Sequence, residues 1–377
     1  MRLSELTTRC HWQTHTAQGW PHEATNVPST TVITGGAGFI GSHLSERVCA
    51  AGRQLLIVDD LSSGRLENID HLLDDPCRFI HARVSDALGN QPHLFDDVSH
   101  IFHLAASVGV KTAIEDPLSM AANNIDETRA VLDLAQRTGA AVLIASSSEV
   151  YGKTTRLPMG EQDDLVLGPP HSPRWSYALS KALDEQLAMA YARQRGVGVV
   201  IGRFFNMIGP RQVGRYGMVV PRFVQQAVAG ENLTIYGDGA QRRTFCDVRD
   251  AVDAMVALLD DPQHHGRVFN LGADQEITIE ALADLVIELA GGRSIKQFVP
   301  YEKAYAGHYE DPPRRLPDLS RIRAAIGFRP RITLRDTLIE LIDQVRRRDG
   351  DITIKPGGRA EQPVAPAKAV DASPRRR

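Results

Sequence analysis

The sequence predicts an α/β protein built on a doubly wound parallel sheet, followed by a smaller C-terminal α/β domain. Two observations lead to this prediction. A β-branched run, Thr31–Thr34, precedes a glycine-spaced turn and an amphipathic helical pattern that ends at Gly52. Strand-like and helix-like segments then alternate along the chain, which is typical of a parallel sheet with helices on both faces.

The glycine turn is the first sign of a ligand. Gly35, Gly38 and Gly41 follow the opening strand at three-residue spacing. The first glycine permits a tight turn, the second lets backbone approach a diphosphate, and the third lets the helix pack closely on the strand. The N–H groups at the start of the helix favour phosphate. The spacing alone is weak evidence, but its place between strand and helix indicates a dinucleotide site.

The second predicted strand, QLLIVDDL, ends at Asp59. An acid about 20 residues beyond the glycines can accept hydrogen bonds from both adenosine ribose hydroxyls and would repel a 2′-phosphate. We therefore predict NAD rather than NADP. Two alternatives remain open: Asp59 only caps the following turn, or the nearby Arg65 accommodates a 2′-phosphate.

The next strand-like segments are CRFIHA, SHIFHLAA and AAVLIASSS, with the helical segment PLSMAANNIDETRAVLDLAQRTG before the last of them. In open α/β sheets, ligands bind beyond the carboxyl ends of the strands, where Ser146–Glu149 fall. A glutamate is costly to bury at such a position without a partner. We therefore expect Glu149 to face the ligand crevice.

Tyr177 and Lys181 lie four residues apart in a predicted helix, and so on one face of it. A phenol is a poor base because its pKa is near 10. A neighbouring ammonium group favours the phenolate, and a serine hydroxyl from the strand end could hold a reacting alcohol beside it. The pair is common in helices, but after a dinucleotide turn it predicts a base.

Together, TGGAGFIG, HLAA, SSSEVYG, YALSK and RFFNMIGPR resemble the extended short-chain dehydrogenase/reductase family of nucleotide-sugar epimerases, dehydratases and decarboxylases. The resemblance covers nearly the whole folded body and implies a Rossmann domain that binds NAD. It also implies roles for three residues. Ser147 would contact the substrate alcohol, Tyr177 would be the base, and Lys181 would bind the nicotinamide ribose and lower the tyrosine pKa.

The resemblance further implies a cofactor-binding set. It comprises Gly35, Gly38, Phe39, Ile40, Gly41, Asp59, Leu104, Ala105, Ala106, Tyr177 and Lys181. Two positions depart from the family pattern. Arg83 stands where an acid often contacts adenine, and Glu127 replaces a usual glycine.

The residue at position 149 helps to distinguish among the reactions that the family catalyses. In the family, simple 4-epimerases usually have a small or hydroxyl residue here, whereas dehydratases and uronate decarboxylases have glutamate. Ser147, Ser148 and Glu149 lack the aspartate of thymidine-linked dehydratases and resemble UDP-glucuronate decarboxylases, as does RW before Tyr177. We predict this activity, with Ser148 and Glu149 in the catalytic set. The alternatives are a 4-epimerase, a 4,6-dehydratase and an NAD-binding regulatory protein. Glu149 could also be scaffold, paired with an arginine.

The resemblance assigns the nucleotide-sugar end to five residues: Asn206, Arg215, Tyr236, Arg243 and Arg315. Asn206 and the arginines would contact the diphosphate–sugar region, and Tyr236 would lie beside the base. Arg215 is the weakest match, because related decarboxylases have their arginine where this chain has Met218.

Composition bounds the remaining predictions. The chain has 377 residues and a formal net charge of −3, which favours neither nucleic acid nor a membrane surface as partner. Cys10, Cys49, Cys77 and Cys246 are widely spaced, which favours reduced thiols in a cytoplasmic protein. The histidines are not joined by carboxylate or cysteine clusters, so we expect no metal site. The family implies a homodimer.

The predicted organisation has four parts. A low-order extension over 1–29 is followed by an NAD-binding domain over 30–205. A substrate-binding domain over 206–348 comes next, and part of it, about 247–275, returns to the first sheet. A disordered tail covers 349–377.

Overall fold

The computed structural model describes residues 29–74, 76–108, 116–169, 171–214, 218–301 and 312–352, the last of them with side chains to 348. Nearly all of the predicted N-terminal extension and most of the predicted tail lie outside these ranges, but residues 349–352 of the predicted disordered tail belong to a helix that ends at Ile352. The strands of the central sheet are β1 (Thr30–Thr34), β2 (Gln54–Asp59), β3 (Cys77–His81), β4 (Val98–His103), β5 (Ala141–Ser147), β6 (Val199–Phe204) and β11 (Arg267–Leu271). The helices around it are α1 (Phe39–Ala50), α2 (Val84–Asn90), α4 (Pro117–Thr138), α5 (Ser176–Arg195), α7 (Val248–Asp260) and α10 (Ser320–Ile326).

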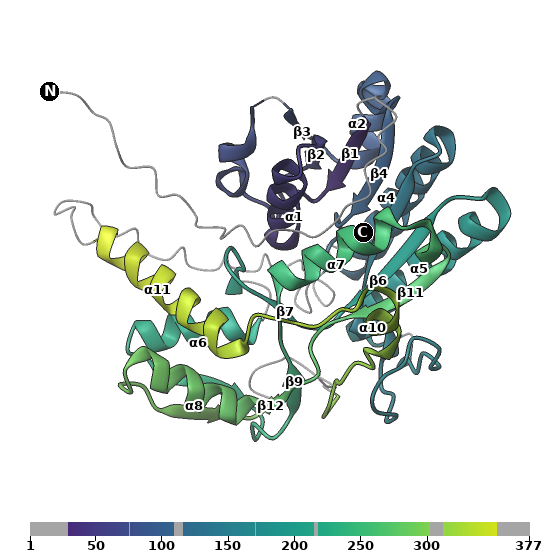
Figure 1. Ribbon diagram of the computed structural model, residues 1–377. Coiled ribbons are helices and arrows are strands. Elements are labelled where there is room, and N and C mark those ends of the chain that lie inside the picture. The colour runs from purple at the N-terminus through teal and green to yellow at the C-terminus, as the bar shows by residue number, and fades with distance from the viewer. Residues whose placement is uncertain are drawn as a thin grey trace, which may run out of the picture.

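The central sheet has seven strands in the order β11-β6-β5-β4-β1-β2-β3, and every neighbouring pair is parallel. α1 and α7 pack on one face, and α2, α4 and α5 pack on the other (Figure 1). This is the doubly wound sheet that the sequence predicts. The chain reverses its direction of winding between β1 and β4, which is where such sheets bind ligands.

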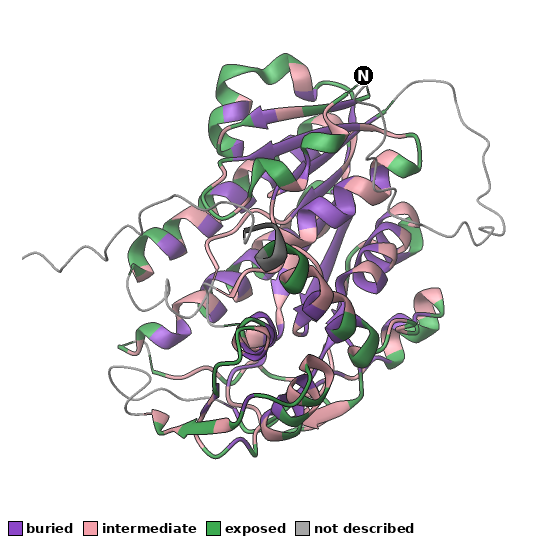
Figure 2. Cartoon of the chain, turned by 90° about the vertical axis from the view of Figure 1, so that its left-hand side faces the viewer, coloured by how far each residue is buried: buried purple, intermediate pink, exposed green. Residues whose placement is uncertain are grey.

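Each strand supplies both hydrophobic layers, because successive side chains point to opposite faces. In β1, Ile33 belongs to the layer under α1 and α7, and Val32 to the layer under α4 and α5. In β2, Ile57 and Val58 divide in the same way. All four side chains are fully buried, and Figure 2 shows burial along most of the sheet with exposed residues on the outer helix faces. Continuous apolar runs are therefore what this sheet requires.

The C-terminal lobe has its own core. It is formed by α6 (Val219–Val228), α8 (Ile279–Ala290), α11 (Leu334–Ile352) and the two-stranded parallel pair of β8 (Leu233–Tyr236) and β13 (Lys296–Val299). Four further short strands complete the lobe. β7 (Met207–Ile208) pairs with β10 (Cys246–Asp247), and β9 (Arg242–Thr244) pairs with β12 (Glu276–Thr278). Between β10 and β12 the chain returns to the large sheet through α7 and β11. The domain boundaries given above remain a prediction.

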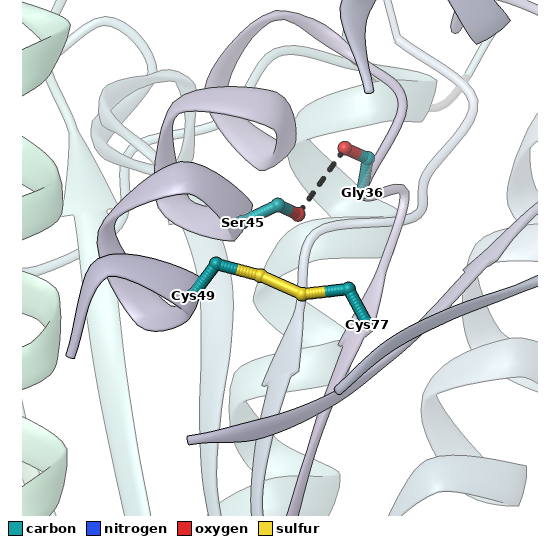
Figure 3. Close-up of a disulfide and its surroundings, with 4 residues drawn as sticks. All are labelled: Gly36, Ser45, Cys49 and Cys77. Atoms are coloured by element: carbon teal, nitrogen blue, oxygen red, sulfur yellow. Dashed lines mark hydrogen bonds between the residues drawn. A yellow bond between two sulfur atoms is a disulfide. The ribbon is translucent and has the colours of Figure 1, made fainter. Parts of the chain in front are cut away.

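The expectation of reduced thiols is wrong for one pair. The structure joins Cys49 to Cys77 in a disulfide, with the two Cα atoms 6.9 Å apart (Figure 3). Cys49 lies in the last turn of α1, and Cys77 begins β3, the edge strand of the sheet, on the face that α1 covers. Cys246 is a free, buried thiol. A separation of 28 residues gave the sequence no local signal for this pairing.

Over the described part of the chain, no helix is long and apolar enough to cross a bilayer. The same residues hold no group of three or more His, Cys, Asp or Glu side chains that could bind a metal ion.

Candidate functional site

A cavity of about 740 Å³ opens at the carboxyl ends of β1, β2, β4 and β5. Its walls come from the β1–α1 turn, the ends of these strands, the start of α5 and a segment of the C-terminal lobe. The predicted site residues among its lining are Gly35, Gly38, Phe39, Ile40, Gly41, Asp59, Leu104, Ala105, Ala106, Ser147, Ser148, Glu149, Tyr177, Lys181, Asn206 and Arg315. Residues spread over most of the chain thus meet in one cavity.

Two of the predicted substrate residues do not line this cavity. Tyr236 lies on β8, where the Arg222 guanidinium is 4.3 Å from the centre of its ring. Arg243 lies on β9, is 8% exposed and donates to the Arg242 carbonyl. Arg215 lies outside the described residues. These three assignments therefore stay predictions.

The glycine turn has the shape of a diphosphate cradle. Gly35 has φ +69°, and a Cβ there would lie 2.8 Å from the Ala105 nitrogen. A Cβ on Gly41 would lie 2.1 Å from the Gly35 carbonyl oxygen, so α1 can approach the turn only if this residue is glycine. The first turn of α1 begins at Phe39 and presents N–H groups that no helical carbonyl can accept. The cavity wall here is backbone.

Asp59, the last residue of β2, lines the cavity beside the glycine turn, where the adenosine ribose is predicted to bind. Its two carboxylate oxygens accept hydrogen bonds from the backbone N–H groups of Ala37 at 2.9 Å and Leu61 at 2.8 Å. Burial raises the pKa of Asp59, while these two hydrogen bonds lower it. Each carboxylate oxygen has two lone pairs, so both oxygens can still accept from ribose hydroxyls. Capping the turn and binding ribose are thus compatible roles.

Tyr177 and Ser147 meet from two different elements. Ser147 is the last residue of β5 and accepts a hydrogen bond from the Glu149 backbone N–H at 3.2 Å, and Tyr177 lies in the first turn of α5. Burial raises the pKa of Tyr177 above its ordinary value, and the negative charge of Glu149 raises it further, while a hydrogen bond with Ser147 lowers it. The phenol is therefore neutral here. The expected effect of the Lys181 ammonium group on this pKa, with the oxidised cofactor beside it, stays a prediction.

Lys181, the ammonium group expected to act on Tyr177, forms a buried ion pair. Its Nζ donates to Asp184 Oδ2 at 3.2 Å, and the two side chains are 3% and 0% exposed. Burial raises the pKa of Asp184, and the Lys181 charge lowers it. The Asp184 carboxylate also raises the pKa of Tyr177, by less than burial and Glu149 do. The sequence reasoning missed Asp184.

Glu149 lies between two arginines. It follows β5 in a short 3₁₀ turn, η4 (Ser148–Tyr151). Arg174 Nη2 lies 2.8 Å from Glu149 Oε2, and Arg315 Nη1 donates to Oε1. Burial by itself would raise the pKa of Glu149, but Arg315 and then Arg174 lower it to about 2. Glu149 is therefore a carboxylate at neutral pH. Arg174 lines the cavity too, and only the RW pair before Tyr177 pointed to it in the sequence.

The two departures from the family pattern meet at the adenosine end. Glu127, on α4, accepts hydrogen bonds from the Ser85 hydroxyl at 2.7 Å and the Ser85 backbone N–H at 3.1 Å. Arg83 Nε lies 3.8 Å from Glu127 Oε1, and both residues line the cavity. The glutamate that replaces glycine therefore holds the start of α2.

The cradle, the ribose acceptor and the tyrosine fit a dinucleotide with a redox-active ring, and comparison with known proteins agrees. The model of the NAD-dependent epimerase/dehydratase family matches residues 31–272. The chain belongs to this family. It is an NAD-dependent enzyme with the Rossmann-type fold of its relatives, which modify nucleotide sugars.

Two curated relatives cover most of the chain. A UDP-N-acetyl-alpha-D-glucosaminuronate decarboxylase from Bacillus cytotoxicus is 38% identical over 325 residues, which span 85% of this chain and 98% of the relative. UDP-glucuronic acid decarboxylase 1 from Arabidopsis thaliana is 36% identical over 319 residues, or 84% of this chain and 70% of the relative. Among solved structures, UDP-glucose 4-epimerase from Thermotoga maritima with UDP-glucose has a TM-score of 0.75 at 27% identity, covering 85% of this chain and 99% of the epimerase.

Proposed function

We propose that the protein decarboxylates a UDP-linked hexuronic acid, with UDP-glucuronate as the first candidate. The observation that carries this proposal is the Glu149 carboxylate held between Arg174 and Arg315 in the same cavity as Tyr177. A simple 4-epimerisation needs no such group, because the same base and hydride serve both directions. The decarboxylase names of the two curated relatives support the same reaction.

The chain's own side chains would act as follows. Ser147 holds the sugar 4-hydroxyl against the phenol oxygen of Tyr177. Tyr177, once ionised, accepts the proton of that hydroxyl. The positive charges of Lys181 and of an oxidised nicotinamide ring both favour this ionisation. The Glu149 carboxylate accepts hydrogen bonds from the sugar or from a water and so orients the ring over the cofactor. We propose that Asn206 and Arg315 hold the diphosphate–sugar region.

When bound, NAD supplies the hydride acceptor for carbon 4 and returns the hydride later. The 4-ketone lies β to the sugar carboxylate, so the bond between carbons 5 and 6 can break as carbon dioxide leaves. The electron pair of that bond moves into an enolate on the carbon 4 oxygen. A proton then adds to carbon 5. Glu149 need not act as the base, because the ketone itself is the electron sink.

The test is incubation of the purified protein with NAD and one of three substrates: UDP-glucuronate, UDP-N-acetylglucosaminuronate or UDP-glucose. Carbon dioxide and a UDP-pentose from the first substrate support the proposal. Release of carbon dioxide from UDP-N-acetylglucosaminuronate alone would support decarboxylation but with a different substrate, the one in the name of the Bacillus relative. A UDP-galacturonate product without carbon dioxide would instead establish a 4-epimerase. Binding without turnover of any of the three substrates would refute the proposed activity.

We also propose a homodimer joined through α4 and α5. Leu118 on α4 is 80% exposed, and Leu179 and Leu183 on α5 are each 44% exposed. Exposed apolar side chains on two adjacent helices suit a helix-to-helix interface. Light scattering should give twice the monomer mass for the wild type and the monomer mass for Leu179→Asp/Leu183→Asp. A monomeric wild type contradicts the proposal.

A cytoplasmic location is our proposal for the protein in the cell. It is supported by a substrate class and a cofactor that are made there. The Cys49–Cys77 disulfide is unusual for that compartment. Alkylation of cells before lysis, followed by mass spectrometry of both cysteine peptides, tests whether the pair is oxidised in place.

A further inference from the structure

Arg174 has no assigned part in the chemistry, yet it is one of the most enclosed charged residues of the cavity. It lies in η5 (Pro173–Trp175), immediately before the helix that carries Tyr177, and is 4% exposed. Its guanidinium carbon lies 5.1 Å from the centre of the Trp175 ring, within cation–π range. Trp175 is itself buried and seated against Gly168, where a Cβ would lie 1.9 Å from the indole nitrogen.

The contact that Arg174 makes joins two parts of the site. Its Nη2 lies 2.8 Å from Glu149 Oε2, whereas the other oxygen of that carboxylate accepts from Arg315. Glu149 follows β5, Arg174 precedes α5, and Arg315 comes from the C-terminal lobe. Each carboxylate oxygen thus has a different guanidinium, supplied by a different segment. Two such contacts fix the plane of the carboxylate as well as its charge.

We propose that Arg174 is a positioning residue, which holds Glu149 ionised and aimed at the sugar beside Tyr177 and acts on the reaction through Glu149. Because η5 runs directly into α5, a shift of Arg174 moves the carboxylate and the base together. With both oxygens held by cations, Glu149 accepts hydrogen bonds and does not donate a proton. The kinetic part of this inference rests on the proposed function, since it needs a turnover to measure.

The first test does not depend on activity. The protein is labelled with ¹³C at glutamate carboxyl carbons, and the Glu149 signal is assigned as the one absent from Glu149→Gln. In the wild type this signal should show no protonation down to about pH 3.5. In Arg174→Gln it should titrate at least one pH unit higher than in the wild type, because an opposite charge within contact distance lowers a carboxyl pKa by about 1–3 units. An unmoved titration overturns the inference, whatever the enzyme's substrate.

The second test is a double-mutant cycle on turnover. Arg174→Gln and Glu149→Gln should each lower kcat by roughly 10- to 100-fold with KM changed less than about threefold. The double variant should be no slower than the slower single variant, because Arg174 acts only through the carboxylate. Multiplied losses would mean that Arg174 contacts the substrate itself and would overturn the inference. Arg174→Lys, which keeps the charge but loses the fork, should recover part of kcat.

Two comparisons exclude a merely structural effect. The acid limb of the kcat profile should move to higher pH in Arg174→Gln, whereas general loosening lowers the rate at every pH without moving the limb. Arg156→Gln is the matched control, because Arg156 pairs with Asp163 at 2.9 Å but its side chain is 77% exposed and does not line the cavity. It should leave both kcat and the limb unchanged. If the wild type turns over none of the three UDP-sugars, the proposed function fails, and the carboxyl titration still decides the role of Arg174.

Discussion

The two ends of the cavity are built from different materials. The cofactor end is mostly backbone. It consists of glycines at which a Cβ would clash with neighbouring backbone and of the N-terminus of α1, so its shape decides what it binds. The sugar end is built from buried charged side chains: Glu149 with its two arginines, and Lys181 with Asp184. The comparison teaches that one protein can bind a common cofactor by shape while it sets its chemistry by charge. The two ends should therefore fail differently when altered.

The largest effect should come from Tyr177→Phe, which removes the base and leaves both ends otherwise intact. We expect turnover to fall by roughly 10³-fold, within the range for loss of a general acid or base. NAD affinity, measured by fluorescence titration, should fall far less than turnover, because Tyr177 is only one of several residues predicted to contact the cofactor. Tyr191→Phe is the matched control on the same helix, because the Tyr191 hydroxyl donates only to the Asp133 carboxylate. A Tyr177→Phe enzyme that kept its turnover would place the base elsewhere.

At the cofactor end, a graded glycine series should separate steric from electrostatic effects. In Gly41→Ala the new Cβ would lie 2.1 Å from the Gly35 carbonyl oxygen, and in Gly38→Ala it would lie 3.2 Å from the same atom. We expect NAD affinity to fall by at least about 100-fold, or about 3 kcal/mol, in the first and by less in the second. Neither change should move the pH profile of the turnover that remains.

Gly89→Ala is the control for this series, since its Cβ would meet open space within α2. It should leave NAD affinity unchanged and raise stability by up to about 1 kcal/mol through helix propensity. Equal losses of affinity at Gly41 and Gly38 would contradict the steric account. Circular dichroism should show first that each variant is folded.

The smallest effect should be a pH dependence of stability that belongs to the sugar end. The pKa of Glu149 is about 2 in the folded chain against an ordinary value of 4.5. A lowered folded pKa stabilises the protein above pH 4.5, and that stabilisation is lost as the pH falls towards 2. Between pH 5 and pH 3 the wild type should lose about 2 kcal/mol that Glu149→Gln does not lose. If the free energy of unfolding of the two proteins fell equally between pH 5 and pH 3, the pairing of Glu149 with its arginines would be contradicted.

The same contrast explains what could be predicted from the sequence. The sheet, its strand ends and the glycine turn follow from local patterns, because β-branched runs, glycine spacing and helix periodicity lie within about 20 residues of one another. Asp59 was predictable for that reason. The family resemblance then supplied Ser147, Tyr177 and Lys181. All of these line one cavity in the structure.

What escaped prediction depends on side chains brought together by the fold. Arg174 lies 25 positions after its partner Glu149. Asp184 and Glu185 are adjacent acids in α5, and the sequence does not show which of them pairs with Lys181. The sequence also contained no sign that burial and two nearby carboxylates, Glu149 and Asp184, raise the pKa of Tyr177. Spacing along the chain does not show which charged side chains the fold brings together or how they shift one another's pKa.

The Cys49–Cys77 bond closes residues 49–77 into a covalent ring that contains β2 and Asp59. The ring includes an exposed stretch at Ser62, Ser63 and Arg65, where a protease could cleave the chain. A single cut there would leave the two fragments attached to each other. On a denaturing gel the nicked chain would run as one band without thiol and as two bands with it, so proteolysis reads out whether this ring is closed.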